Sequence, residues 1–258
     1  MRFKIELALE NPVENLLPVN YQYEVSSWIY NTIHMGDKDI ATWLHDHGYK
    51  LKDKSFRLFS FSNLNIPKWN LIYDRLQIQS PQVNLIVSFY PVKILEPFIM
   101  GVFKEQKCEI GDKKSKVSFL VKSIEKLPEP KFIQKMRYKC LSPMHIAWRN
   151  PESSEIKYLD PEHPEFENLL ITNLVNKQQA FNQKQEITAL PQDFKFNLIS
   201  KPKRKAIKIK AGTREETTLI GYLFDFDFEA PPEYQKLGYY CGFGKANAMG
   251  FGCVGMVV

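Results

Sequence analysis

The sequence predicts an α+β protein made of two tandem ferredoxin-like domains, each with the element order βαββαβ. Two observations lead to this fold. Each half of the chain follows roughly the order strand, helix, strand, strand, helix, strand, and residues 127–134, "LPEPKFIQ", have the composition of a linker. Such an order is typical of an antiparallel sheet with helices on one face. We therefore expect a first domain over residues 1–126 and a second over residues 135–258.

The first half begins with a strand over residues 2–9, where apolar residues alternate at the period of two. A helix is expected over residues 19–33, with an apolar side formed by Val25, Trp28, Ile29 and Ile33. Asp37 is suited to cap a short helix over residues 38–47, and Gly48 to end it. The other elements expected in this half are a helix at 92–105, which contains Pro97, and strands at 55–64, 68–78, 82–91 and 116–127.

The second half repeats the order of the first without repeating its sequence. Two helices are expected, at 161–182 and at 231–241, and the second has proline in its first turn. The strands are expected at 135–142, 193–200, 203–212, 218–230 and 249–258.

The composition limits the classes of protein to which the chain can belong. The chain has 258 residues, of which 44% are hydrophobic, so it can bury substantial cores, and its formal net charge of +6 is compatible with an acidic partner. No run of 18 apolar residues and no signal peptide are present, so we expect a cytoplasmic protein. The cysteines are scattered without a C-x-x-C pair, which predicts reduced thiols and no structural zinc: Cys108, Cys140, Cys241 and Cys253.

A glycine-rich segment, "GFGKANAMGFG", lies at residues 242–252. It does not fit the dinucleotide-binding fingerprint, because Asn247 occupies the third glycine position and only six residues follow Gly252. It does not fit the P-loop either, because Gly244 and Lys245 are followed by alanine. Two interpretations remain. The glycines either form a tight turn into the last strand, or they let a phosphate approach the backbone.

A basic strand precedes this segment. In "KPKRKAIKIK" the alternation places Arg204, Lys208 and Lys210 on one face with Ala206, and places Ile207 and Ile209 on the other. Lysines on an edge strand often serve only to prevent pairing. The alternative is that the strand binds a polyphosphate backbone. If the halves fold as predicted, the strand lies near the glycine-rich segment, which favours a nucleic-acid backbone over a single nucleotide as the ligand. The six cations are Lys201, Lys203, Arg204, Lys205, Lys208 and Lys210.

Two helices carry titratable side chains whose direction the helical period predicts. With Ile40 as reference, His45 lies about 140° away, off the apolar side, whereas His47 falls back toward it. Tyr30 likewise lies about 140° from Val25. We expect His45 and Tyr30 to face outward, where they could converge, and His47 to face inward if the helix extends to it. The alternative is that His45 and Tyr30 are ordinary surface residues.

The segment "GFGKANAMGFGCV" resembles the C-terminal motif of the CRISPR-associated repeat-processing endoribonucleases, the Cas-six family of the repeat-associated RNA-binding superfamily. Members of this family carry a loop of this G-Φ-G-x5-G-Φ-G form before their last strand. The similarity extends over the whole chain, because other segments agree: "MRFKIEL", "YQYEVSSWIYNTI", "ATWLHDHG", "CLSPMHI" and "SKPKRKAIKIKAG".

The resemblance implies roles for particular residues of the first domain. The catalytic histidine of relatives lies in "LH", which matches His45, and the catalytic tyrosine lies in "IYN", which matches Tyr30. A lysine of relatives is replaced by Arg57 in "RLFSFS", and arginine keeps the charge but cannot act as a base. Further candidates for catalytic roles are Lys52, Lys54 and His47.

The resemblance also implies metal-independent cleavage of precursor CRISPR RNA within each repeat. RNA supplies its own nucleophile, the 2′-hydroxyl, so we expect neither a metal nor another cofactor, and products with a 2′,3′-cyclic phosphate and a 5′-hydroxyl. Histidine can act as the general acid or as the general base at neutral pH. The sequence leaves open which of His45 and Tyr30 is the acid and which is the base.

The expected partner is CRISPR repeat RNA, held by the six cations of the basic strand and by Gly242, Gly244, Lys245, Gly250 and Gly252. No membrane is expected as a partner. Further subunits of a CRISPR interference complex and a second copy of the chain are partners that the sequence leaves open. The alternative function is a non-catalytic repeat-binding subunit of such a complex. An enzyme acting on a small phosphate compound is disfavoured, because no helix follows the glycine-rich segment.

Overall fold

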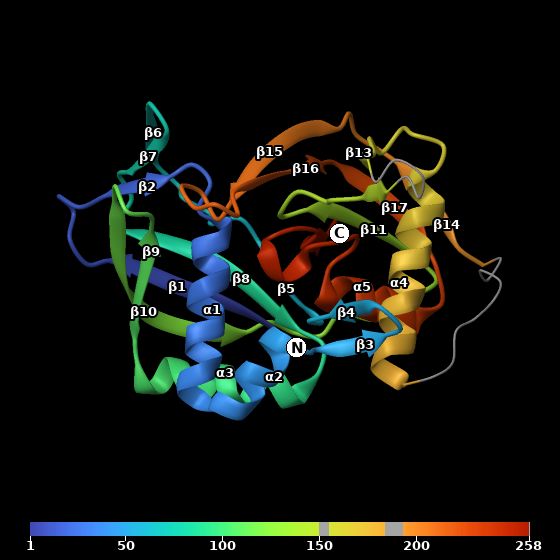
Figure 1. Ribbon diagram of the computed structural model, residues 1–258, viewed down its shortest axis with the longest axis horizontal. Coiled ribbons are helices and arrows are strands. Elements are labelled where there is room, and N and C mark those ends of the chain that lie inside the picture. Colours follow the sequence, from blue (N-terminus) through green and yellow to red (C-terminus); the bar gives the residue numbers. More distant parts are fainter. Residues whose placement is uncertain (150–154, 184–192, 258) are drawn as a thin grey trace. The chain divides into compact units, whose positions relative to one another are not determined.

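The computed structural model describes residues 1–149, 155–183 and 193–257, and its helices and antiparallel sheets form two compact units (Figure 1). Unit 1 comprises Met1–Asp46, Asn63–Glu129 and Lys208–Thr217, and unit 2 comprises His47–Ser62, Pro130–Ile207 and Thr218–Val258. Relative to the predicted ranges 1–126 and 135–258, residues 47–62 and 208–217 are exchanged between the units. The predicted domain boundaries themselves remain a prediction.

The elements of unit 1 are β1 (Arg2–Leu9), β2 (Leu16–Pro18), α1 (Gln22–Gly36), α2 (Lys38–Asp46), β6 (Trp69–Ile72), β7 (Arg75–Ile78), β8 (Gln82–Phe89), α3 (Val92–Lys104), β9 (Lys107–Gly111) and β10 (Lys116–Lys126). Its main sheet has the order β8-β1-β10-β9, with antiparallel neighbours. The alternation predicted for β1 is confirmed, because Phe3, Ile5 and Leu7 are buried.

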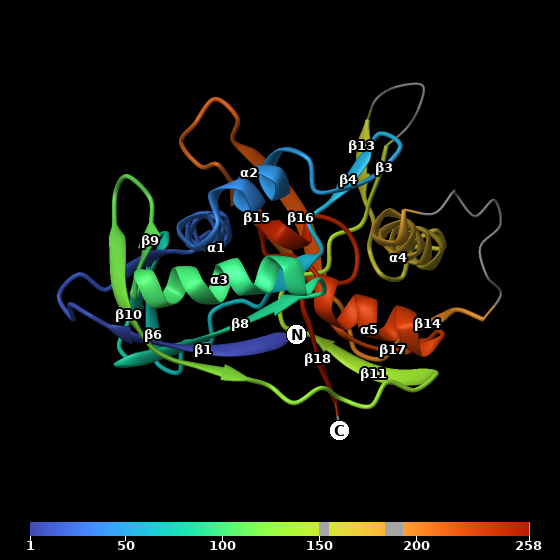
Figure 2. The ribbon, with the colours of Figure 1, turned by 90° about the horizontal axis from the view of Figure 1, so that it is seen from below.

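Helices α1 and α3 lie on one face of this sheet (Figure 2). They cross closely, since a Cβ atom built on Gly101 would lie 1.8 Å from the Thr32 carbonyl oxygen, and one built on Gly36 would lie 1.8 Å from that of Pro97. The helix predicted at 92–105 is therefore confirmed, with Pro97 inside it. The Trp28 and Phe98 rings, 6.0 Å apart, join the two helices within the core.

A second sheet of unit 1 has the order β2-β7-β6. The single strand predicted over residues 68–78 is wrong, because this segment is a hairpin of β6 and β7. Two residues, Tyr73 and Asp74, form its turn, and Tyr73 has a positive φ of 52°. The alternating apolar residues are Trp69, Leu71 and Tyr73 up to the turn and Leu76 and Ile78 after it, so a shift in the phase of the alternation was the available signal.

The elements of unit 2 are β3 (Tyr49–Leu51), β4 (Lys54–Phe56), β5 (Phe59–Phe61), β11 (Lys135–Cys140), β12 (Ala147–Arg149), β13 (Ile156–Tyr158), α4 (Phe166–Asn182), β14 (Lys195–Leu198), β17 (Asp225–Glu229), α5 (Pro232–Cys241), a 3-10 turn (Asn247–Met249) and β18 (Val254–Met256). Strands β15 (Lys203–Ile209) and β16 (Thr217–Leu223) pair with each other and contain residues of both units.

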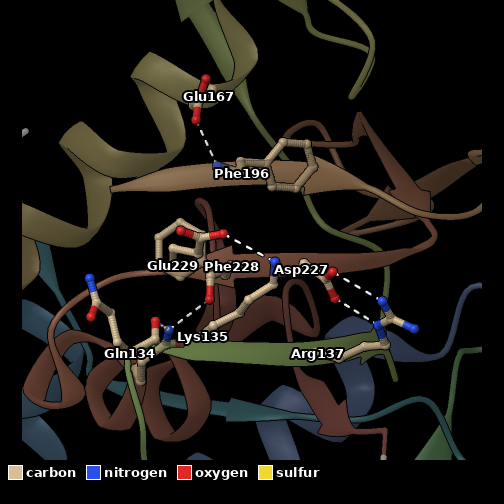
Figure 3. Close-up of polar contacts among 9 residues, drawn as sticks. Gln134, Lys135, Arg137, Glu167, Phe196, Asp227, Phe228 and Glu229 are labelled. Carbon is tan, nitrogen blue, oxygen red and sulfur yellow. Dashed lines mark hydrogen bonds and ion pairs between the residues drawn. The ribbon is translucent and has the colours of Figure 1, made fainter. Parts of the chain in front are cut away.

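The main sheet of unit 2 has the order β14-β17-β11-β18, and α4 and α5 lie on one side of it (Figure 2). Along the chain its elements follow the order β11, α4, β14, β17, α5, β18, as predicted for the second half. On β11 and β17, Arg137 donates two hydrogen bonds to Asp227, at 2.7 and 3.0 Å (Figure 3). This contact with the guanidinium lowers the pKa of the Asp227 carboxyl.

The core of unit 2 is aromatic. The ring of Phe243, from the glycine-rich segment, lies 5.3–5.4 Å from the rings of Tyr138, Phe226 and Phe228. The glycine-rich segment therefore contributes a core residue as well as a surface loop.

No helix in the described ranges is long and apolar enough to cross a membrane.

The close crossing of α1 and α3 gives a stability prediction. Gly101→Ala should lower the free energy of unfolding by about 1–3 kcal/mol, because its Cβ would force the helices apart. Alanine has the higher helix propensity, so without the clash the sign would be reversed. Urea unfolding measures the change, with Met100→Ala, on the exposed side of α3, as the control. A Gly101→Ala variant as stable as the unchanged protein would contradict the crossing.

Candidate functional site

Helices α1 and α2 bring Tyr30 and His45 together. Their ring centroids are 5.6 Å apart and the ring planes are at 81°, an edge-to-face contact. The side chain of His45 is 73% exposed and Tyr30 is half-buried, so the outward direction predicted for His45 is confirmed. Within unit 1 the predicted convergence of these two side chains is therefore confirmed as geometry.

The start of α2 is fixed as the sequence predicts. The Asp37 carboxylate accepts a hydrogen bond of 2.9 Å from the Ile40 N–H, which caps the helix. At the other end of α2, Nδ1 of His45 lies 2.8 Å from a carboxylate oxygen of Asp46. When Nδ1 donates its proton to Asp46, Nε2 carries the lone pair and is able to accept a proton from a substrate.

The inward direction predicted for His47 depends on the helix extending to this residue, and the helix does not extend to it. Helix α2 ends at Asp46, so the helical period no longer applies at His47, whose side chain is exposed. Gly48 follows with a φ of +61°, and a Cβ there would lie 2.6 Å from the Phe56 carbonyl oxygen. The backbone thus turns at this glycine into β3, and His47 belongs to unit 2.

Unit 2 carries the other catalytic candidates on and beside the β3–β4 hairpin. Lys52, with a φ of +52°, is in the hairpin turn, and Lys54 begins β4. Arg57 follows this strand and donates a hydrogen bond to the Ser55 hydroxyl. The hairpin thus gathers three cationic side chains, Lys52, Lys54 and Arg57, over six residues of chain.

The glycine-rich segment is a tight loop between α5 and β18. Gly252 has a φ of +72°, and a Cβ there would lie 1.8 Å from the Phe243 carbonyl oxygen, so only glycine fits. The Asn247 side-chain amide donates to the carbonyls of Phe243 and Phe251, both at 3.0 Å, and closes the loop. The alternative of a tight turn, raised by the sequence, therefore accounts for Gly252.

Several N–H groups of the loop are used inside the protein. Those of Gly242, Lys245 and Gly252 donate to Gly238, His145 and Pro143 respectively. These N–H groups already have acceptors in the protein, so the phosphate-binding role predicted for the loop is restricted to its remaining polar groups. Lys245 is exposed as a residue, but its ammonium donates a hydrogen bond to the Ala147 carbonyl. The pKa of this ammonium is lowered, mainly by partial burial and further by the positive charge of Lys54.

Lys177 is a buried residue that the sequence-based prediction missed. It lies in α4, is 3% exposed, and donates from Nζ to the carbonyls of Gly242 at 2.7 Å and Gly244 at 2.8 Å. Burial lowers its pKa from 10.5 to about 8. A signal was available, because Lys177 is one heptad after Leu170 and three residues after Leu174, on the buried side of the helix.

The basic strand has the alternation that the sequence predicts. Ile207 and Ile209 on β15 are each 5% exposed, whereas the cations from Lys201 to Lys208 are exposed. The cations near the end of β15 have anionic partners: Lys208 pairs with Glu216 at 3.1 Å, and Lys210 pairs with Glu215.

Within the described residues no group of three or more His, Cys, Asp or Glu side chains is arranged to hold a metal ion. The four cysteines are free thiols, and Cys108, Cys241 and Cys253 are buried. Burial raises the pKa of Cys241 to about 12, which makes it a poor nucleophile.

Two family models match the chain. The model for "CRISPR-associated protein Cas6, N-terminal" matches residues 16–125, and the model for "CRISPR associated protein Cas6, C-terminal" matches residues 127–256.

Known proteins resemble the chain over nearly all of its length. The Methanocaldococcus jannaschii protein named CRISPR-associated endoribonuclease Cas6 1 is 30% identical over 255 residues, which are 97% of this chain and 91% of that protein. The Pyrococcus furiosus protein named CRISPR-associated endoribonuclease Cas6 is 28% identical over 259 residues, 98% of this chain and 89% of that protein. A solved structure described as a Cas6-related gene from Pyrococcus furiosus has a TM-score of 0.82 and 26% identity, and covers 100% of this chain and 98% of its own.

The lowered pKa of Lys177 predicts how the free energy of unfolding depends on pH. Below about pH 8 the folded protein bears the full cost of a buried charge. Between about pH 8 and 10.5 the folded state releases this proton while the unfolded state keeps it, so the contribution of Lys177 to stability rises with pH. Relative to Lys177→Met, the free energy of unfolding should increase by up to about 3 kcal/mol over this range.

Urea unfolding at a series of pH values measures this difference. The exposed Lys195→Met on β14 is the matched control and should show a constant difference from the unchanged protein. A constant difference for Lys177→Met as well would contradict the burial of a titrating ammonium.

Proposed function

The chain belongs to the Cas6 family of CRISPR-associated proteins, and we propose that it binds CRISPR repeat RNA and cleaves precursor CRISPR RNA within the repeat. The observation that carries the proposal is the contact between Tyr30 and His45 on the surface of unit 1, with ring centroids 5.6 Å apart. The names of two curated relatives, from Methanocaldococcus jannaschii and Pyrococcus furiosus, are CRISPR-associated endoribonucleases and support the reaction class.

The proposal includes a fold for each half, a ferredoxin-like domain. In unit 2 the chain order β11-α4-β14-β17-α5-β18 and the sheet order β14-β17-β11-β18 support this assignment. In unit 1 the packing of α1 and α3 on one face of an antiparallel sheet supports it as well (Figure 2).

In the proposed reaction the 2′-hydroxyl next to the scissile phosphate attacks that phosphate. One group removes the 2′ proton and another protonates the leaving 5′-oxygen, which gives a 2′,3′-cyclic phosphate and a 5′-hydroxyl. His45 is suited to one of these roles, because its imidazole is accessible and Asp46 is able to hold the proton of Nδ1. Tyr30 would orient the 2′-hydroxyl or share the proton transfer. This chemistry requires no metal.

Negative charge builds up on the phosphate oxygens in the transition state. We assign its stabilisation to the cations of the β3–β4 hairpin, of which Arg57 takes the place of a lysine in relatives, with Lys52 and Lys54 close to it in sequence. Positioned cations at a site of developing charge are the usual means of stabilising it. His47 is exposed and remains a further candidate in this region.

RNA binding is assigned to the basic strand, with Lys201, Lys203, Arg204 and Lys205 as its exposed cations. Lys208 lies on the same strand and Lys210 directly follows it, but their ammonium groups are already paired with Glu216 and Glu215. The N–H groups of Gly242, Gly250 and Gly252 already donate to carbonyls of the protein, and Gly244 and Gly250 are buried. The contribution of the glycine-rich loop to RNA binding is therefore assigned to the exposed Lys245.

Cleavage of the repeat RNA tests the proposal. The RNA is taken from the CRISPR array nearest the gene and incubated with the protein in EDTA. The unchanged protein should cut at a single position, and His45→Ala should lose about 10²- to 10⁴-fold in rate while binding the RNA as before. His34→Ala, an exposed histidine at the end of α1, is the matched control and should retain the rate.

Two outcomes would contradict the proposal. If the unchanged protein binds the repeat but leaves it whole, the chain is a repeat-binding subunit without cleavage activity. If His45→Ala cuts as fast as the unchanged protein, another residue carries the proton transfer.

The ion pairs of β15 give a second prediction, for the dependence of RNA affinity on salt. Lys203→Gln should lower the slope of log affinity against log salt by about 0.7–0.9, because one phosphate contact is lost. Lys208→Gln should lower it less, because Glu216 already holds that ammonium. Fluorescence anisotropy with labelled repeat RNA measures both slopes, and equal changes would show that Lys208 leaves Glu216 for the RNA.

A further inference from the structure

The peptide group between Gly244 and Lys245 is held at both of its ends. In a trans peptide the C=O of one residue and the N–H of the next point in opposite directions from one rigid plane. The Gly244 carbonyl accepts a hydrogen bond of 2.8 Å from the Lys177 ammonium. The Lys245 N–H, in the same plane, donates a hydrogen bond of 2.8 Å to the His145 carbonyl. This plane is therefore fixed from two sides.

The same ammonium holds a second peptide group of the loop, between Gly242 and Phe243. The Gly242 carbonyl accepts a hydrogen bond of 2.7 Å from Lys177, and the Phe243 N–H donates one of 2.9 Å to the Gly252 carbonyl. One side chain of α4 thus fixes the two peptide planes on either side of Phe243, whose ring lies in the aromatic core of unit 2.

These two planes need such a restraint because each follows a glycine. Gly242 and Gly244 have φ values of +82° and +72°, and a residue without a Cβ atom allows the next peptide plane a wide range of rotation. Lys177 can hold both carbonyls at once because an ammonium has three N–H donors, whereas a hydroxyl has one. Lys177 is 3% exposed, so it is too buried to contact RNA itself.

Lys245 is the residue whose direction these restraints determine. It directly follows the plane that Lys177 and His145 hold, and it is the one charged residue in the segment 242–252. Its side chain reaches the surface, where the ammonium donates one of its three N–H groups to the Ala147 carbonyl. A rotation of the preceding plane would change the direction in which this side chain leaves the backbone.

We propose that Lys177 is a positioning residue for RNA binding: by holding the peptide plane between Gly244 and Lys245, it directs the Lys245 ammonium toward a phosphate of the repeat RNA. The inference rests on the proposed function, because it takes RNA as the ligand of Lys245. Lys177 makes no contact with the RNA and acts only through the loop.

A double-mutant cycle tests this dependence. Fluorescence anisotropy measures the affinity for a labelled repeat RNA with 2′-deoxyribose before the scissile phosphate, so that binding is measured without cleavage. Lys245→Met and Lys177→Met should each weaken binding by about tenfold, the loss expected when a hydrogen bond to a charged group is removed. The double variant should bind within about twofold of Lys245→Met, because Lys177 acts through Lys245.

Two control variants separate positioning from stability and from charge. Leu170→Ala leaves a cavity at a residue of α4 that is 0% exposed and retains the Lys177 donors. Lys195→Met removes one exposed cation from β14. Both should bind the RNA within about twofold of the unchanged protein, at a temperature where circular dichroism shows every variant to be folded.

Hydrogen exchange of the peptide that contains residues 242–252 is the second readout, and it needs no RNA. Lys177→Met should lose protection in this peptide, and Lys195→Met should retain it. The inference is overturned if Lys177→Met keeps the protection, if it binds RNA as tightly as the unchanged protein, or if its effect is the same with and without Lys245. If the unchanged protein itself does not bind the repeat, the proposed function is wrong.

Discussion

The hydrogen bonds from the Lys177 ammonium to the carbonyls of Gly242 and Gly244 determine the shape of the glycine-rich loop. Carbonyls turned into the protein by positive-φ glycines need donors, and α4 supplies a buried cation for two of them. The Asn247 amide closes the rest of the loop. With the loop fixed in this way, Phe243 enters the aromatic core of unit 2, and Lys245 is held beside the β3–β4 hairpin near Lys54. The loop is therefore first a structural element, and any contact with RNA uses the few atoms that this structure leaves accessible.

Buried contacts also determine the positions of the proposed catalytic pair, Tyr30 and His45, through the packing of the helices in unit 1. Tyr30 is on α1, whose position is set by the close crossing with α3 at Gly101, and His45 is on α2, which begins at the Asp37 cap. Both helices therefore have fixed positions, and the two rings meet at an angle of 81°. An accessible imidazole with a carboxylate on Nδ1 is well suited to move one proton for a nucleophile that the RNA itself supplies.

Much of this arrangement could be predicted from the sequence, because it depends on local patterns. The strand at residues 2–9, the helix cap at Asp37 and the outward direction of His45 all follow from the period and from capping chemistry. Two local patterns changed within the predicted segments: the phase of the apolar alternation shifts at the turn after Ile72, and α2 ends one residue before His47. Lys177 was missed because a lysine is normally expected in solvent, and only the structure shows the two carbonyls that it bonds.

The central claim is that the RNA supplies the nucleophile and the protein moves protons. The most direct test is cleavage of a repeat RNA that carries 2′-deoxyribose only at the nucleotide before the scissile phosphate, with product ends identified by mass spectrometry. The account predicts that this single substitution abolishes cleavage but not binding, and that the unmodified RNA yields a 2′,3′-cyclic phosphate and a 5′-hydroxyl. Cleavage of the deoxy substrate at the same position, or products with a 5′-phosphate, would contradict it.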